Sequence, residues 1–130
     1  MQKLQPPGWA TPKGYVNGIT AKGSFVFVGG QIGWDAEQQF YSDDFIVQTR
    51  QALENVRAVL ACAGAGPEHM VRMTWYITDR DEYNARLREL GTAYRAVMGK
   101  HFPAMTCVEV GRLVETRAKV EIEVTAVLPG

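Results

Sequence analysis

The sequence is poor in the residues that build metal centres and disulfide frameworks. Its two cysteines, Cys62 and Cys107, lack C-x-x-C spacing, and its two histidines, His69 and His101, sit in no metal-ligand pattern. Structural zinc sites and disulfide scaffolds require such side chains at short, repeated spacings. We therefore expect neither in this chain.

An excess of charge of one sign is also missing. Fourteen basic and fourteen acidic side chains give a formal net charge of zero, without a run of five like charges. Such a chain has no net field that attracts nucleic acid or an acidic membrane. The N-terminus lacks an apolar signal core, and no segment approaches the ~18 uninterrupted apolar residues of a membrane span. We expect a soluble cytoplasmic protein.

What is present suits one compact domain over residues 1–130, because 46% of the residues are hydrophobic. Residues 1–14 contain three prolines and two glycines and are predicted to form an N-terminal arm. β-Branched and aromatic residues over 15–21 and 25–29 flank the pair Lys22-Gly23, which predicts a two-stranded hairpin. The FVFV run in the second strand predicts cover on both faces.

Helical periodicity over residues 43–61 predicts the first helix, with Ser42 or Asp43 as its cap and Gly64 and Gly66 as left-handed stops. Residues 69–78 are rich in β-formers and should form a central strand. A capping box at Asp79 and Glu82 opens a second helix, which a stripe of apolar residues extends to Met98 before Gly99. Strands are predicted at 104–110 and 119–127.

This order predicts an α+β fold, β-β-α-β-α-β-β, with two helices on one face of the sheet. The last strand alternates an apolar set under the helices with Glu121 and Glu123 on the other face. Register matching predicts that Met105 and Cys107 share the face of these carboxylates. Because that face mixes apolar and acidic groups, we expect self-association with pockets at the seams.

Several motifs resemble the RidA (YjgF) family, whose members include reactive intermediate deaminases and L-PSP endoribonuclease-like proteins. They are Gly14-Tyr15, GGQIG at 29–33, the helix QTRQALENVRAVLACAG, and FPAMTCVEVGRLVETRAKVEIEVTAV. The resemblance implies a chorismate-mutase-like fold with a mixed sheet. It also implies a homotrimer with a barrel-like interior and three clefts between subunits. The implied activity is hydrolysis of 2-enamines and 2-imines to 2-keto acids and ammonia, with no metal or organic cofactor.

Residue by residue, the resemblance implies a cleft lined by Tyr15, Gly30, Cys107 and Glu121. Glu121 would hold and activate the water, because imine hydrolysis needs an oriented nucleophile at the C=N carbon. Its neighbour Glu123 is the rival for that role. Cys107 is expected to be a pocket wall, since the sequence provides no histidine base beside it.

The sequence departs from the deaminating pattern at Met105, where those members carry an arginine that binds the substrate carboxylate. Gly91 stands where they commonly carry an asparagine. We therefore expect a substrate other than a simple 2-imino acid, with Arg72 or Arg112 as a replacement cation. Aromatic residues available to line the cleft are Trp34, Trp75 and Tyr94. The alternatives are a trimer that binds a metabolite without turnover and, disfavoured by the neutral charge, an endoribonuclease or translation inhibitor.

Overall fold

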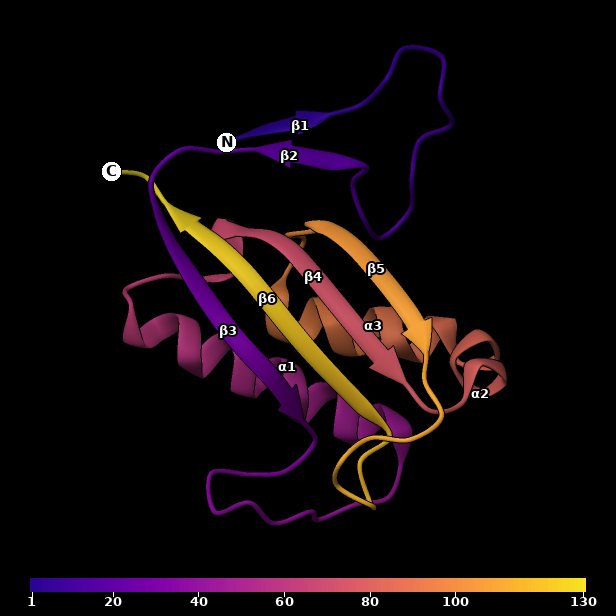
Figure 1. Ribbon diagram of the computed structural model, residues 1–130. Helices are drawn as coiled ribbons and strands as arrows, with labels where there is room; N and C mark the ends of the chain where they lie inside the picture. The colour runs from indigo at the N-terminus through magenta and orange to yellow at the C-terminus, as the bar shows by residue number, and fades with distance from the viewer.

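The computed structural model describes residues 1–130 as a four-stranded mixed sheet with helices behind it (Figure 1). The sheet order is β3 (Ser24–Ile32), β6 (Val120–Leu128), β4 (Met70–Ile77) and β5 (Ala104–Glu109). The helices are α1 (Phe45–Cys62), α2 (Arg80–Ala85) and α3 (Leu87–Met98), with a 3₁₀ turn η1 (Pro67–His69). A separate two-stranded sheet pairs β1 (Gln2–Leu4) with β2 (Gly18–Thr20). The predicted α+β class is confirmed, and so is the central position of the strand predicted at 69–78.

The hydrophobic core lies between the helices and one face of this sheet. It contains 19 buried residues, among them Leu53 and Leu60 of α1, Met73 of β4 and Ile122 of β6. Alternation along β6 follows the predicted pattern, because Val120, Ile122, Val124 and Ala126 are all buried. None of the helices is long and apolar enough to cross a membrane.

The cap of α1 is Asp44, and the prediction of Ser42 or Asp43 is wrong by one or two residues. The Asp44 carboxylate accepts hydrogen bonds from the backbone N–H groups of Ile46 and Val47, both at 3.1 Å. Ser42 contributes indirectly, since its hydroxyl accepts the Asp44 N–H. Arg86 donates to the same carboxylate at 2.8 Å and so links α1 to the α2–α3 junction. At the other end, Gly64 is left-handed as predicted, with φ of 72°, whereas the prediction for Gly66 is wrong, because its φ of −140° is extended.

Replacing Asp44 with alanine is expected to lower the free energy of unfolding by about 1 to 2 kcal/mol at neutral pH, because helix caps contribute this much. The hydrogen bond from Arg86 lowers the pKa of Asp44 below its usual 3.8. A lowered folded-state pKa means that the stabilisation is complete above the unfolded pKa and is lost as the pH falls through the folded one. Urea unfolding should therefore show the difference between wild type and Asp44→Ala shrinking below about pH 4. Asp44→Asn, which keeps the cap without the charge, is the control, and a difference that is constant down to pH 2 would contradict this account.

The second predicted helix is divided. Asp79 caps α2 as expected, because its side chain accepts the Glu82 N–H at 3.0 Å, but the helix breaks at Arg86. Arg86 has φ of −122° and ψ of 29°, outside the helical region. Its side chain binds Glu89 as well as Asp44. Gly99, with φ of 66°, ends α3 as predicted.

The predicted hairpin across Lys22-Gly23 is wrong. β2 pairs with β1 in the arm, and β3 pairs antiparallel with β6. Gly23 has φ of 145°, and a Cβ there would lie 1.8 Å from the carbonyl oxygen of Leu128. This contact sets Gly23 against the end of β6, so the chain enters β3 beside β6 instead of folding back on β2.

The predicted face of Met105 and Cys107 is also wrong. In the parallel pairing of β4 with β5, Met73 is opposite Met105 and Trp75 is opposite Cys107. Paired residues of adjacent strands point to the same side of a sheet. Met105 and Cys107 therefore face the helices and pack against the core. Thr106 and Val108 share the open face with the carboxylates.

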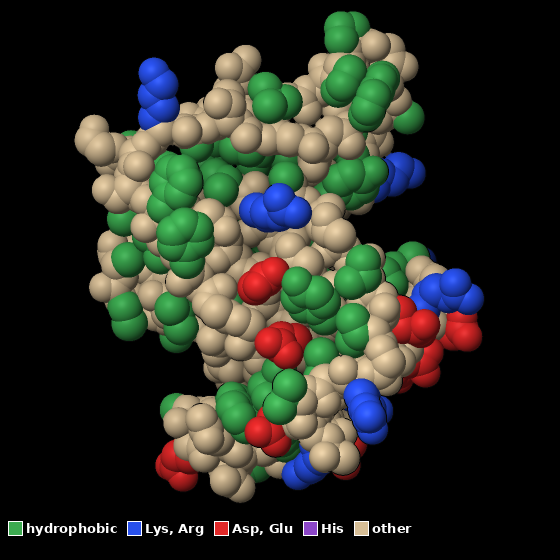
Figure 2. Space-filling model, in the orientation of Figure 1, with side chains coloured by type: hydrophobic (Ala, Val, Ile, Leu, Met, Phe, Trp, Pro, Cys, Tyr) green, Lys and Arg blue, Asp and Glu red, His purple; other side chains and the backbone are tan.

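The open face, which Figure 2 views, combines apolar and acidic side chains. Phe25 and Phe27 of β3 are 60% and 71% exposed, and Val108 of β5 is 42% exposed. Glu121 and Glu123 of β6 lie between these two strands on the same face. The expected cover over the second face of FVFV is therefore not supplied by the chain itself.

Candidate functional site

Glu121 and Gly30 lie in contact on the open face. β3 bulges between Val28 and Gln31, so Gly29 and Gly30 fall outside the register of pairs with β6. A Cβ on Gly30 would lie 2.0 Å from the nearer carboxylate oxygen of Glu121. Only glycine leaves room for the carboxylate in this position. Of the four residues expected to line the cleft, Gly30 and Glu121 are thus brought together.

The rival carboxylate, Glu123, is already engaged. It accepts a hydrogen bond of 2.8 Å from the Tyr76 hydroxyl, and this bond raises the pKa of Tyr76. The side chain of Glu121 has no hydrogen bond or ion pair within the chain and is half-buried. Of the two, Glu121 is the carboxylate free to bind a water or a ligand.

A second feature is a pocket of about 500 Å³ between β5, α3 and the N-terminal segment. Its position depends on a parallel bridge between Val16 and Ala104, in which the Val16 N–H donates to the Pro103 carbonyl at 3.2 Å. This bridge sets Tyr15 beside the start of β5, where Met105 forms part of the wall. The lining residues are Lys13, Gly14, Tyr15, Trp75, Tyr83, Leu87, Leu90, Gly91, Tyr94, Arg95, Phe102 and Met105.

Aromatic rings form much of the pocket wall. Tyr94 stacks on Phe102 with centroids 5.2 Å apart, and Tyr83 meets Trp75 edge-on at 6.4 Å. The Tyr94 hydroxyl donates to the His101 carbonyl, while Trp75 Nε1 is buried without a partner. Burial raises the pKa of Tyr83 to about 12, so its hydroxyl remains protonated at neutral pH. The aromatic part of the wall is therefore apolar with neutral hydrogen-bonding groups, and Lys13 and Arg95 are the charged residues of the lining.

Cys107 lies beside Tyr83, outside the residues that line this pocket. Burial raises the pKa of its thiol, and a hydrogen bond with Tyr83 opposes the shift only in part. Because the thiolate is the nucleophilic form, a raised pKa disfavours covalent catalysis at neutral pH. No group of three His, Cys, Asp or Glu side chains is arranged to hold a metal ion.

The predicted site residues thus fall into two groups on opposite faces of the sheet. Tyr15 and Met105 line the pocket, with Cys107 next to it, and Gly30 and Glu121 meet on the open face. Trp75 and Tyr94 are part of the pocket, whereas Trp34 packs against Phe40 and is not in its lining. Sequence reasoning missed Lys13, Tyr83, Arg95 and Phe102 as lining residues. For Arg95 a signal existed, because residues 91 and 95 are one helical turn apart.

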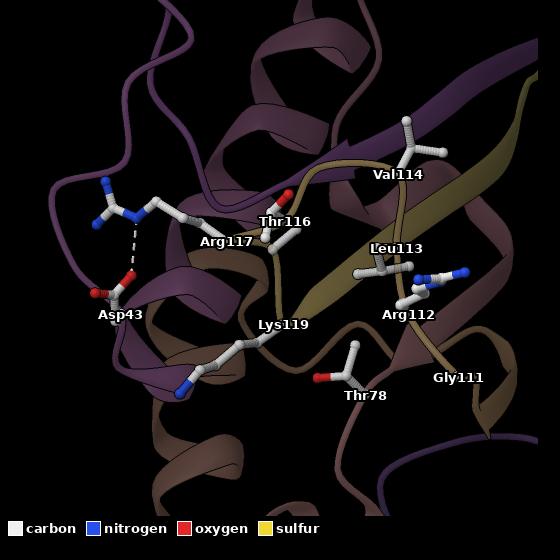
Figure 3. A pocket seen from close by; sticks show the side chains of 10 residues that line it. Asp43, Thr78, Gly111, Arg112, Leu113, Val114, Thr116, Arg117 and Lys119 are labelled. Atoms are coloured by element: carbon white, nitrogen blue, oxygen red, sulfur yellow. Dashed lines mark hydrogen bonds and ion pairs between the residues drawn. The ribbon is translucent and has the colours of Figure 1, made fainter.

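Neither arginine expected to replace the missing cation lies in this pocket. Arg72 lies in a smaller hollow of the open face with Glu123. Arg112 lines a separate cavity of about 900 Å³ formed largely by residues 111–119. Figure 3 shows the guanidinium groups of Arg112 and Arg117 on opposite sides of that cavity, with Arg117 bound to Asp43 at 2.9 Å. The two guanidinium groups therefore do not converge on one ligand group, and that of Arg117 is already paired with Asp43.

The fold and the site together define a small α+β protein with an aromatic pocket at a sheet edge and an unpaired carboxylate on the other face. The family described as Endoribonuclease L-PSP matches residues 8–128. The 2-iminobutanoate/2-iminopropanoate deaminase of Salmonella typhimurium is 36% identical over 116 residues, 87% of this chain and 86% of that protein.

Two solved structures extend the comparison. The Rid family protein YyfB from Yersinia pestis superposes with a TM-score of 0.86 at 26% identity, over 98% of both chains. Escherichia coli TdcF with bound serine gives a TM-score of 0.69 at 31% identity, over 98% of this chain and 99% of TdcF. The chain therefore belongs to the RidA (YjgF) family, as its motifs indicate.

Proposed function

We propose that the protein is a hydrolase of the RidA type that acts on a reactive enamine, imine or related small unsaturated metabolite. The observation that carries this proposal is the Glu121 carboxylate, unpaired and set against the backbone of Gly30. The names of curated relatives, which include an iminobutanoate and iminopropanoate deaminase, support the reaction class.

The chemistry requires only water and a base. Water adds to the C=N carbon while Glu121 takes one of its protons and passes it to the imine nitrogen, which gives a neutral carbinolamine. Glu121 then takes the hydroxyl proton of that intermediate and delivers it to the amino nitrogen, so that ammonia leaves, the carbonyl forms and Glu121 is ionised again. A positioned general base of this kind contributes about 10²- to 10⁴-fold in rate. Tyr15, Met105 and Cys107 would shape the binding end of the cleft.

We further propose that the cleft forms between subunits of a homotrimer. In one chain Glu121 and Met105 face opposite sides of the sheet, so one substrate reaches both only if two chains contribute. The exposed apolar side chains of the open face, Phe25 and Phe27, favour burial in an assembly.

Sedimentation at micromolar concentration is expected to give the mass of three chains. The variant Phe27→Asp should shift the distribution to smaller species, because it places a charge in the apolar part of the proposed interface. The control is Val114→Asp, which adds the same charge at a side chain that is 99% exposed. Phe40 is unsuitable for this purpose, because it contacts Trp34 and Arg117 within the chain. A wild-type monomer would contradict the trimer.

The direct test of function is ammonia release from a panel of enamines and imines of graded size. Acceleration of at least one compound is expected, with simple 2-imino acids poor because Met105 cannot bind a carboxylate. If none is accelerated, the hydrolase proposal fails.

The apolar wall at Met105 favours the second candidate, a trimer that binds a metabolite without turnover. In that case calorimetry with the same compounds would still detect binding. RNA cleavage that co-purifies with the trimer and disappears in a cleft variant would support the third candidate, an endoribonuclease or translation inhibitor.

A further inference from the structure

Arg95 occupies the space that a side chain at position 91 would take. A Cβ built on Gly91 would lie 3.0 Å from Nη1 of Arg95 and 3.7 Å from its Cζ and Nη2. The guanidinium therefore lies close over the backbone of Gly91, one turn earlier in α3. Both residues line the aromatic pocket, so this cation is at the pocket wall.

The charge of Arg95 is not neutralised within the protein. Some arginines of the chain have acidic partners, as Arg50 has Glu54, Arg86 has Asp44 and Arg117 has Asp43. Arg95 has none, and among the arginines without an acidic partner it is the one that lines the aromatic pocket. The side chain of Arg95 makes no ion pair or hydrogen bond, and the pocket lining contains Lys13 but no aspartate or glutamate. Two positive charges thus border a cavity whose remaining wall is largely aromatic and aliphatic. Such a cavity favours an anion with an apolar body.

We propose that Arg95 is a specificity-determining residue that binds the carboxylate of a substrate with an aromatic or long apolar body. This inference rests on the proposed function, because it names the substrate class of that site. The pocket of about 500 Å³ accommodates the apolar body against Tyr94, Phe102 and Met105, and the carboxylate lies at Arg95, with Lys13 as the second cation of the lining. Gly91 leaves room for this arrangement, because even a Cβ there would lie 3.0 Å from Nη1 of Arg95 and a longer side chain would compete with the guanidinium for the same space.

A structural explanation of Arg95 competes with this one. Arg95 lies in the last turn of α3, where a cation interacts favourably with the helix dipole. That role would make Arg95 matter for stability and not for ligand binding. The two roles are separable, because a dipole contact does not distinguish a carboxylate from an alcohol in the pocket.

The test is calorimetric binding of 3-phenylpropanoate and its neutral analogue 3-phenylpropan-1-ol to the native assembly. Wild type is expected to bind the carboxylate more tightly than the alcohol. Arg95→Gln should weaken carboxylate binding about tenfold and leave alcohol binding unchanged, since one exposed charge-assisted contact is lost. Arg88→Gln is the matched control, because Arg88 is exposed on the same helix and lies outside the pocket lining. It should bind both probes like wild type.

A second variant keeps Arg95 but adds a side chain next to its guanidinium. Gly91→Asn is expected to weaken carboxylate binding several-fold with the charge still present, because the asparagine side chain would take the space next to Nη1 of Arg95, which lies 3.0 Å from the position of its Cβ. The inference is overturned if wild type does not bind 3-phenylpropanoate, or if Arg95→Gln binds it like wild type. Equal losses for both probes in Arg95→Gln would also overturn it, since they indicate a structural role.

These outcomes are distinct from those that test the hydrolase. If the carboxylate preference depends on Arg95 but no imine is hydrolysed, the proposed role of Arg95 is supported and the hydrolase proposal fails. If imines are hydrolysed and Arg95→Gln leaves KM for the imine of phenylalanine unchanged, the hydrolase proposal is supported and the proposed role of Arg95 fails. Binding and turnover therefore report on the two proposals independently.

Discussion

Replacing Glu121 with glutamine is expected to lower kcat/KM for the best imine substrate by about 10²-fold or more, because the amide cannot accept the proton of the attacking water. Glutamine keeps the volume of the side chain and its contact with Gly30, so the fold and the pocket should persist. The loss should appear mainly in kcat, since a base acts in the transition state and contributes little to ground-state binding. Ammonia release under steady-state conditions measures it.

Glu123→Gln is the matched control for this prediction. Glu123 lies two residues further along β6 on the same face, but its carboxylate accepts the Tyr76 hydroxyl at 2.8 Å. A group that is already hydrogen-bonded is a poorer base for water, so its replacement should change kcat/KM less than about threefold. A larger loss in Glu123→Gln than in Glu121→Gln would reverse the assignment of the base. Circular dichroism and sedimentation confirm that both variants fold and assemble.

The helices and strands were predictable because each depends on a local pattern. The apolar stripe that buries Leu53 and Leu60, the alternation of Val120 and Ile122, and the cap at Asp79 all follow from residues within a few positions of one another. The family resemblance placed Gly30 and Glu121 in one cleft, and the bulge in β3 brings these two residues into contact.

The register of β5 was not predictable in the same way. Its two faces have similar polarity, with Met105 and Cys107 on one side and Thr106 and Val108 on the other. Alternation therefore does not decide which face meets the helices, and only the parallel pairing with β4 does. The predicted hairpin was wrong for a related reason, because the pairing of β3 depends on the contact of Gly23 with Leu128, which are far apart in the sequence.

The pocket required both local and long-range information. Residues 91 and 95 share a helix face by spacing alone, but nothing in the sequence places Tyr15 and Lys13 opposite that face. The bridge between Val16 and Ala104 does so, and it joins the N-terminal arm to an edge strand. A site built across such a contact becomes visible only in three dimensions.

Introducing the family arginine, Met105→Arg, is expected to raise kcat/KM for 2-iminopropanoate by about tenfold to a hundredfold. An arginine bound to a carboxylate contributes roughly 1.5 to 3 kcal/mol, which is a factor of this size. The aliphatic stem of arginine can cover the same apolar surface as Met105, which is half-buried against the core. Met105→Gln, of similar length and without charge, is the control and should give no gain.

The positive charges already in the pocket limit how far Met105→Arg can raise kcat/KM for 2-iminopropanoate. Arg95 and Lys13 line the same cavity, so a third positive charge is repelled and its side chain is harder to order. The double variant Met105→Arg/Arg95→Gln should therefore exceed Met105→Arg on 2-iminopropanoate while losing activity on imines of larger acids. A gain in both variants would show that the rest of the cleft is competent for hydrolysis and that the position of the carboxylate-binding arginine determines the substrate. No gain in either variant, with each folded and assembled, would favour a protein that binds its metabolite without hydrolysing it.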